Sequence, residues 1–223
     1  MATNLNLEEQ DQLDALKHFW GQFGGAISAL LLLVLVSLAG WNGYRFWQGR
    51  QAAQASAMFD EVERAVATSE LDLAQRAFND MKERFASTSY APQAGLLVAK
   101  MAIDSGKEDA AATASAALQW VADNASDEGM RAVAALRLSA LMIDAKQYEQ
   151  AHKTLQSVHA EAFSALVQDR LGDLYVQQSK TEDAKAAYLK AFAGMDAGSE
   201  YRRLIKIKLN ALGVEPPAPA GAG

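Results

Sequence analysis

The chain has 223 residues, with 21 Lys and Arg against 27 Asp and Glu, no cysteine, 15 glycines and 4 prolines. The formal net charge of −6 is mild and mixed, which excludes the basic footprint expected of a nucleic-acid-binding protein. The lack of cysteine excludes disulfides and thiol nucleophiles, and the scarcity of glycine and proline favours helices over strands.

Residues 1–22 form a leader with four carboxylates and a single basic residue, Lys17. From Asp11 to Phe23, apolar residues recur at spacings of three and four, which predicts a short amphipathic helix suited to a membrane surface. These residues are Leu13, Leu16, Trp20 and Phe23. Glycines then predict a loosened junction before the next segment: Gly21, Gly24 and Gly25.

Residues 23–44, from Phe23 to Tyr44, contain no Asp, Glu, Lys or Arg and are predicted to be a transmembrane helix. A helix of this length reaches roughly 33 Å, close to the bilayer hydrocarbon thickness of about 30 Å. Aromatic side chains, which prefer the headgroup level, flank both ends: Phe19 and Trp20 before the segment, and Trp41, Phe46 and Trp47 at or beyond its end.

Two other interpretations of this segment are possible. A core helix could be apolar all round, but the uncharged stretch from His18 to Tyr44 is long for one. A signal peptide cleaved after Ala39 would leave a soluble periplasmic repeat protein, but signal peptides begin with basic residues and this leader is acidic. Basic residues on the two sides of the segment nearly balance, since Lys17 and the terminal amine stand against Arg45 and Arg50. Taken alone, this count leans slightly toward a cytoplasmic C-terminal side.

Residues 45–212 are predicted to form an array of helix pairs. The spanning helix is expected to continue to Ala67, and a second helix is expected over 71–85. Ser69 with Asp72, and Ser179 with Glu182, have the spacing of a capping box at the start of a second helix. Repetition of a two-helix unit is typical of a helical solenoid.

The last unit has the residues of a tetratricopeptide repeat, without its leading Trp and closing Pro. Small residues are expected where the two helices cross closely, and larger ones are expected to fill the space around the crossing. The packing residues are Leu171, Gly172, Tyr175, Ala184, Tyr188 and Ala191, with Ala151 as the equivalent of Ala184 in the preceding unit.

The last predicted helix, 199–212, is expected to cap the array with a polar outer face. Its apolar stripe is Tyr201, Ile205, Leu209 and Leu212, and its basic residues, predicted to be solvated, are Arg202, Arg203, Lys206 and Lys208. Residues 213–223 are predicted to be a disordered tail.

No catalytic motif is present, and no metal or cofactor site is predicted. His152 and His159 would stand roughly 10 Å apart along one helix, too far to share a metal. Helical repeats instead bind partners on a concave surface formed by their first helices. The candidate groove residues are Leu136, Ala140 and Asp144 in one unit and Asp169, Asp173 and Gln177 in the next.

The order of these parts resembles the YfgM-like family, the ancillary SecYEG translocon subunits of Gram-negative bacteria. The most specific matches are the leader EEQDQLDALKHFW and the segment GWNGYRFWQ at the far end of the span. The resemblance implies an inner-membrane protein with a cytoplasmic N-terminus and a periplasmic repeat domain. It also implies contact with the translocon and with a membrane-anchored periplasmic chaperone related to peptidyl-prolyl isomerases, and it brings no catalytic residues.

We therefore expect an all-α, non-enzymatic binding scaffold at the SecYEG translocon that helps pass exported proteins to periplasmic chaperones. The alternative is a structural adaptor that organises an envelope or cell-division complex through its repeats. Short helical units bury little core for their area, so a homodimer is also left open, as are the client proteins.

Overall fold

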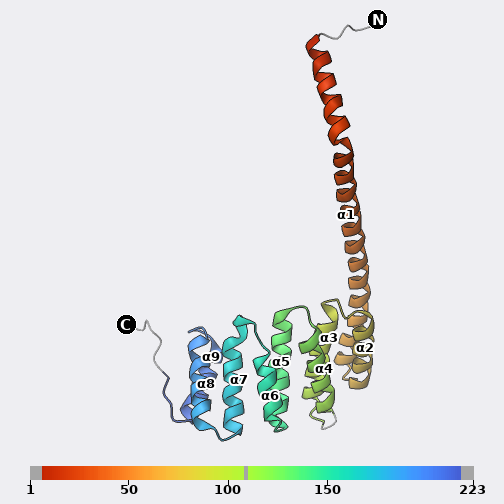
Figure 1. Cartoon of the computed structure of the whole chain (residues 1–223). Helices are drawn as coiled ribbons and strands as arrows, with labels where there is room; N and C mark the ends of the chain where they lie inside the picture. Colours follow the sequence, from red (N-terminus) through yellow and green to blue (C-terminus); the bar gives the residue numbers. More distant parts are fainter. Residues whose placement is uncertain (1–6, 108–109, 217–223) are drawn as a thin grey trace. The chain divides into compact units, whose positions relative to one another are not determined.

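The computed structural model describes residues 7–107 and 110–216, and this part of the chain contains helices and no strand (Figure 1). The all-α prediction is confirmed. The helices are α1 (Leu7–Ala67), α2 (Leu71–Arg84), α3 (Tyr90–Asp104), α4 (Ala110–Asn124), α5 (Glu128–Asp144), α6 (Tyr148–Gln156), the 3₁₀ turn η1 (Glu161–Phe163), α7 (Ser164–Gln177), α8 (Thr181–Gly194) and α9 (Glu200–Ala211). The chain divides into two compact units, one ending at Gln51 and the other beginning at Ala52.

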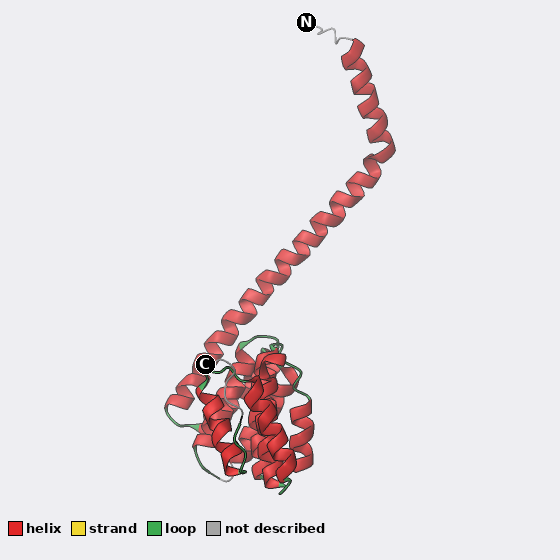
Figure 2. Ribbon diagram, turned by 90° about the vertical axis from the view of Figure 1, so that its left-hand side faces the viewer, coloured by secondary structure: helices red, strands yellow, loops and turns green. Residues whose placement is uncertain are grey.

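The first unit is formed by most of α1, a helix of 61 residues. Its part from Gln12 onward is long and apolar enough to cross a membrane. Residues 11–23 are helical as predicted, but the expectation that they form a short helix of their own is wrong, because α1 runs without interruption past the three glycines. Figure 2 shows that the helix bends in its N-terminal part instead of breaking.

In its described residues, the second unit is an array of four helix pairs closed by α9, and the pairs follow one another in chain order (Figure 1). The end of α1 pairs with α2, and α3, α5 and α7 pair with α4, α6 and α8. The largest core cluster joins the first two pairs around Phe78, Leu118 and Val121. The last pair and α9 share a cluster that includes Tyr188, Ile205 and Leu209. Each pair therefore buries its apolar face against its neighbours, as expected of a solenoid.

A left-handed residue follows the first helix of each pair. The turn residues are Ser69, Gly106, Lys146 and Ser179, with φ of 60°, 62°, 60° and 60°. At the third turn, the Lys146 N–H donates to the Ile143 carbonyl at 2.9 Å and the Gln147 N–H donates to the Met142 carbonyl at 2.8 Å. This is the Schellman arrangement that ends helices in a left-handed residue.

The predicted capping boxes at Ser69 and Ser179 are wrong. Both serines are turn residues that end the first helix, and α2 and α8 have no side-chain hydrogen bond at their N-caps. Residues 213 and 214 of the predicted tail close α9 in the same way, since Gly213 has a φ of 76° and Val214 packs against the last core cluster. The rest of the predicted tail from 217 onward lies outside the described residues.

Substituting glycine at the third turn should stabilise the repeat unit. A side chain in the left-handed region is strained, whereas glycine is not. Lys146 is exposed, and its side chain has no hydrogen bond or ion pair with the described residues. We expect Lys146→Gly to raise the free energy of unfolding by about 0.5–1 kcal/mol, net of the added freedom of the unfolded chain. Denaturant titration of the full chain in detergent measures this change in the free energy of unfolding. Gly106→Ala, which places a side chain in the left-handed region, should lower the free energy of unfolding.

Candidate functional site

A pocket of about 240 Å³ lies between α5 and α7; it is called the α5–α7 pocket below. It is lined by Ala140, Ile143, Asp144, Arg170, Asp173, Val176, Gln177 and Tyr188. Four of the six residues predicted to form a groove are in this set: Ala140, Asp144, Asp173 and Gln177. The helical spacing thus brings these four together on one surface.

The other two predicted groove residues are buried, which corrects the expectation that they face a ligand. Leu136 is 9 % exposed and packs with Leu155 and Val167. Asp169 is 1 % exposed and contacts two side chains of α9. Both lie one helical turn before the pocket residues, where neighbouring elements cover the first helices.

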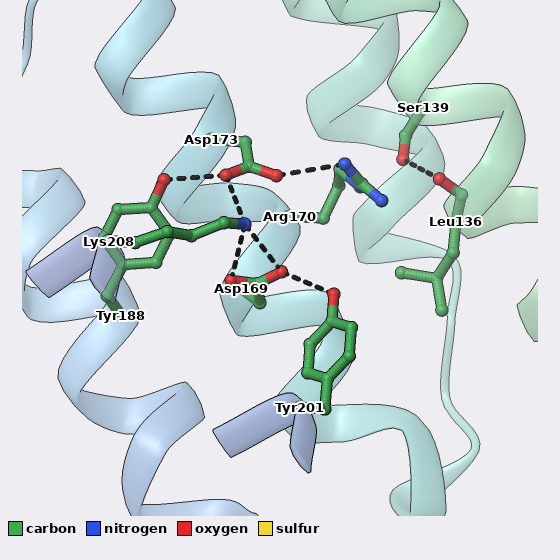
Figure 3. A network of polar contacts seen from close by, with 8 residues as sticks. All are labelled: Leu136, Ser139, Asp169, Arg170, Asp173, Tyr188, Tyr201 and Lys208. Atoms are coloured by element: carbon green, nitrogen blue, oxygen red, sulfur yellow. Dashed lines mark hydrogen bonds and ion pairs between the residues drawn. The ribbon is translucent and has the colours of Figure 1, made fainter. Parts of the chain in front are cut away.

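A polar cluster connects α7, α8 and α9 at one wall of this pocket (Figure 3). The ammonium of Lys208 donates to Asp169 Oδ1 at 2.9 Å and to Asp173 Oδ1 at 2.7 Å. The Tyr201 hydroxyl donates to Asp169 at 2.8 Å, and the Tyr188 hydroxyl donates to Asp173 at 2.7 Å. The second oxygen of Asp173 accepts from Arg170 at 3.0 Å.

The charges of this cluster balance, because two carboxylates face one ammonium and one guanidinium. Burial raises the pKa of Tyr188 above its usual range, and the hydrogen bond to Asp173 adds to this. Burial and the hydrogen bond to Asp169 raise the pKa of Tyr201 in the same way. Both phenols therefore stay neutral hydrogen-bond donors, which suits a structural role at the end of the array.

The prediction that all four basic residues of the last helix are solvated is wrong for two of them. Arg202 is half-buried, with its guanidinium carbon 4.1 Å from the centre of the Phe192 ring. Lys208 is also half-buried. Its side chain is 23 % exposed and reaches across to α7. Residues Tyr201, Ile205 and Lys208 recur at spacings of four and three, so they share one helical face. That spacing was the signal that Lys208 belongs to the packed stripe.

The predicted repeat-packing residues lie in two groups. Tyr175, Ala184, Tyr188 and Ala191 belong to the cluster of the last pair and α9. Gly172 faces Tyr188, since a Cβ added to it would lie 2.3 Å from Tyr188 Cε1. Leu171 instead contacts the preceding pair, in the cluster that holds Ala151. The close crossing of α7 and α8 therefore depends on Gly172, and Leu171 joins the two pairs.

Within residues 7–107 and 110–216, no three His, Cys, Asp or Glu side chains are placed to hold a metal ion. His159 is exposed and His152 is half-buried on α6. The α5–α7 pocket presents two carboxylates, a guanidinium, an amide, a phenol and aliphatic side chains.

Comparison with known proteins gives two consistent results. The family model of the tetratricopeptide repeat-like domain matches residues 17–214. An ancillary SecYEG translocon subunit of Neisseria gonorrhoeae is 30 % identical over 93 % of this chain and 98 % of its own length. Proteins of the same name from Escherichia coli and Haemophilus influenzae are 29 % and 31 % identical, over 92 % and 93 % of this chain and 97 % and 98 % of their own lengths.

Proposed function

The chain belongs to the tetratricopeptide repeat-like family of ancillary SecYEG translocon subunits, and on that premise we propose that it is a membrane-anchored binding scaffold beside the translocon. In this proposal it holds exported proteins as they emerge and helps pass them to periplasmic chaperones. The observation that carries the proposal is the extent of the similarity, which takes in both the apolar helix and the repeat array.

The proposed topology is a single pass through the inner membrane. Residues 1–22 would be cytoplasmic, residues 23–44 would span the bilayer and the repeat array would be periplasmic. The exposed apolar surface of α1 supports the span: within it, Leu30 to Val36 are each between 44 % and 65 % exposed. In a soluble protein this apolar surface would be exposed to water, which is highly unfavourable in free energy.

An anchored scaffold needs only weak contacts. A short tether holds its binding surface at an effective concentration of order mM near the exit of the channel. The α5–α7 pocket offers such a surface, with no catalytic group required. A membrane-anchored isomerase-like chaperone is the proposed partner that receives the exported chain.

Site-specific photocrosslinking in membranes tests this function. We would place a photoreactive residue at Tyr44, which is 50 % exposed near the end of the span, and separately at Gln177, which lines the α5–α7 pocket. Tyr44 should crosslink to a translocon subunit, and Gln177 to an exported chain or a periplasmic chaperone. Glu149, exposed on α6, is the matched control and should give neither product at a comparable yield.

Three results would change this assignment. Crosslinks to cell-division or cell-wall proteins at both positions would favour the structural adaptor. Crosslinks from Gln177 to cytoplasmic proteins would show that the repeat array lies on the cytoplasmic side, opposite to the proposed topology. A product of twice the mass of the chain from Tyr44 would show a homodimer that contacts itself near the span.

A further inference from the structure

The first helices of the four pairs are the end of α1, α3, α5 and α7. Counting back from the turn residue that follows each of them gives equivalent positions in all four. The turn residues are Ser69, Gly106, Lys146 and Ser179. Three residues before each turn stands a β-branched aliphatic residue: Val66, Ile103, Ile143 and Val176. Two of these, Ile103 and Val176, are 43 % and 41 % exposed. Ile143 is buried and Val66 is half-buried. The ends of the first helices therefore carry a repeated apolar position, and it is open to a partner in α3 and α7.

A second pocket, of about 560 Å³, occupies the place equivalent to the α5–α7 pocket two units earlier; it is called the α1–α3 pocket. Four aligned positions line both pockets. Each pocket lies between two first helices. One of the four positions is on the earlier helix, three residues before the turn residue that follows it. The other three are on the later helix, nine, six and two residues before the turn residue that follows that helix. They hold Val66, Leu97, Lys100 and Asp104 in the α1–α3 pocket, and Ile143, Arg170, Asp173 and Gln177 in the α5–α7 pocket.

The side chains of the α1–α3 pocket suit an apolar anchor. Four of its lining residues are aliphatic: Val66, Leu71, Leu97 and Met101. The charges of Lys100 and Asp104 are paired with each other, and the third charged residue of the lining, Lys107, is exposed to solvent. A large uncharged side chain could therefore be buried here without leaving a buried charge unpaired.

The side chains of the α5–α7 pocket suit a basic anchor. The carboxylate of Asp173 is already occupied by Arg170, Tyr188 and Lys208. Asp144 is exposed and has no hydrogen-bond or ion-pair partner among the described residues. Beside it, Ile143 and Val176 offer an apolar wall for the aliphatic stem of Lys or Arg.

We propose that the repeat array binds an extended polypeptide at two points, with an apolar side chain in the α1–α3 pocket and a Lys or Arg side chain beside Asp144 in the α5–α7 pocket. The pockets are two first-helix spacings apart, roughly 16–20 Å at about 8–10 Å per spacing. An extended chain covers that distance in about five or six residues. This inference rests on the proposed function, since it names the segment of an exported protein that the scaffold would recognise.

The spacing can be tested with fluorescent peptides and the full chain in nanodiscs. Each peptide carries one Leu and one Arg in a Gly/Ser background, in either order. Peptides with the two anchors about six residues apart should bind about tenfold more tightly than those with anchors about three apart, because only the first kind fills both pockets. Equal affinity at both spacings would overturn the proposal, and so would a failure of every peptide to bind.

The basic anchor is tested by reversing the charge in the α5–α7 pocket. Asp144→Lys should weaken the Leu/Arg peptide about fivefold and strengthen a Leu/Glu peptide by a similar factor. Glu149→Lys makes the same charge change on an exposed residue of α6 that lines neither pocket. It should leave both affinities unchanged. If the two variants change the peptide affinities by the same factors, the proposed binding by an apolar and a basic anchor is wrong. Crosslinks from Gln177 to exported chains would still support the scaffold function.

Discussion

Replacing Lys208 with methionine should lower the free energy of unfolding of the repeat array by about 2–4 kcal/mol, the largest effect we expect of a single substitution. Methionine keeps most of the length and apolar stem of lysine but removes the charge. Asp169, 1 % exposed, would then keep only the Tyr201 hydroxyl as a partner among the described residues. A buried carboxylate without its cation is costly, although the partial exposure of Lys208 moderates the loss.

Because repeats contact only their neighbours, the loss should appear first at the C-terminal end of the array. Denaturant titration of the full chain in detergent gives the total loss in the free energy of unfolding. Hydrogen exchange should show that the backbone amides of α9 and α8 exchange faster than in the unchanged protein. Lys206→Met, an exposed change on the same helix, is the control and should stay within about 0.5 kcal/mol.

Adding Asp169→Asn to Lys208→Met should restore part of the stability, because it removes the unpaired charge but keeps an acceptor for Tyr201. The buried-charge explanation fails if Lys208→Met costs no more than Lys206→Met. It also fails if the second substitution makes the loss larger.

Gly172→Ala should destabilise the last helix pair by about 1–3 kcal/mol, even though alanine favours helix more than glycine does. The new Cβ would lie 2.3, 2.4 and 2.8 Å from three ring atoms of Tyr188. The ring cannot simply move aside, since Tyr188 is 3 % exposed and its hydroxyl is bound to Asp173. Either the helices separate or the hydrogen bond breaks, and thermal unfolding of the full chain followed by circular dichroism measures the cost.

Two further variants distinguish overpacking from a general effect of the glycine change. Gly49 lies in α1, and apart from its chain neighbours and its own helix backbone nothing in the described chain comes within 4 Å of the new Cβ, so Gly49→Ala should not destabilise the chain. In a Tyr188→Ala background the clash is absent, and Gly172→Ala should then be neutral or stabilising. A loss of the same size in that background would show that Tyr188 is not the cause.

The pattern of the sequence predicts the helices and the repeat, because both depend on short spacings. Leu171, Gly172 and Tyr175 lie within two turns of one helix, and their sizes indicate a close crossing before any partner is known. The uncharged stretch of α1 is equally local. The turns are different: Ser69 fits both a capping box and a left-handed turn, and only the neighbouring hydrogen bonds decide between them. Lys146 carries no local signal for its turn.

The part of the site that depends on spacing within one helix could also be predicted from the sequence, and the part that depends on distant residues could not. Helical spacing places Ala140 and Asp144 on one surface and Asp173 and Gln177 on the next, and the pocket holds all four. Whether a surface is open or covered depends on distant parts of the chain. Asp169 is covered by Lys208, 39 positions later, and no periodicity within α7 indicates that contact.

The left-handed turns also bear on how such an array can change in evolution. The same backbone hydrogen bonds close the joint whether it holds Ser or Lys, and the side chains of Ser69, Lys146 and Ser179 are exposed. The intervals from 69 to 106, 106 to 146 and 146 to 179 are unequal, so the helices and the connections between pairs absorb the differences in length. Each pair is thus a module that can lose its sequence signature, or gain a few residues, without losing its geometry. An ancestral duplication could in this way yield pockets that keep the same place while their ligand preferences diverge.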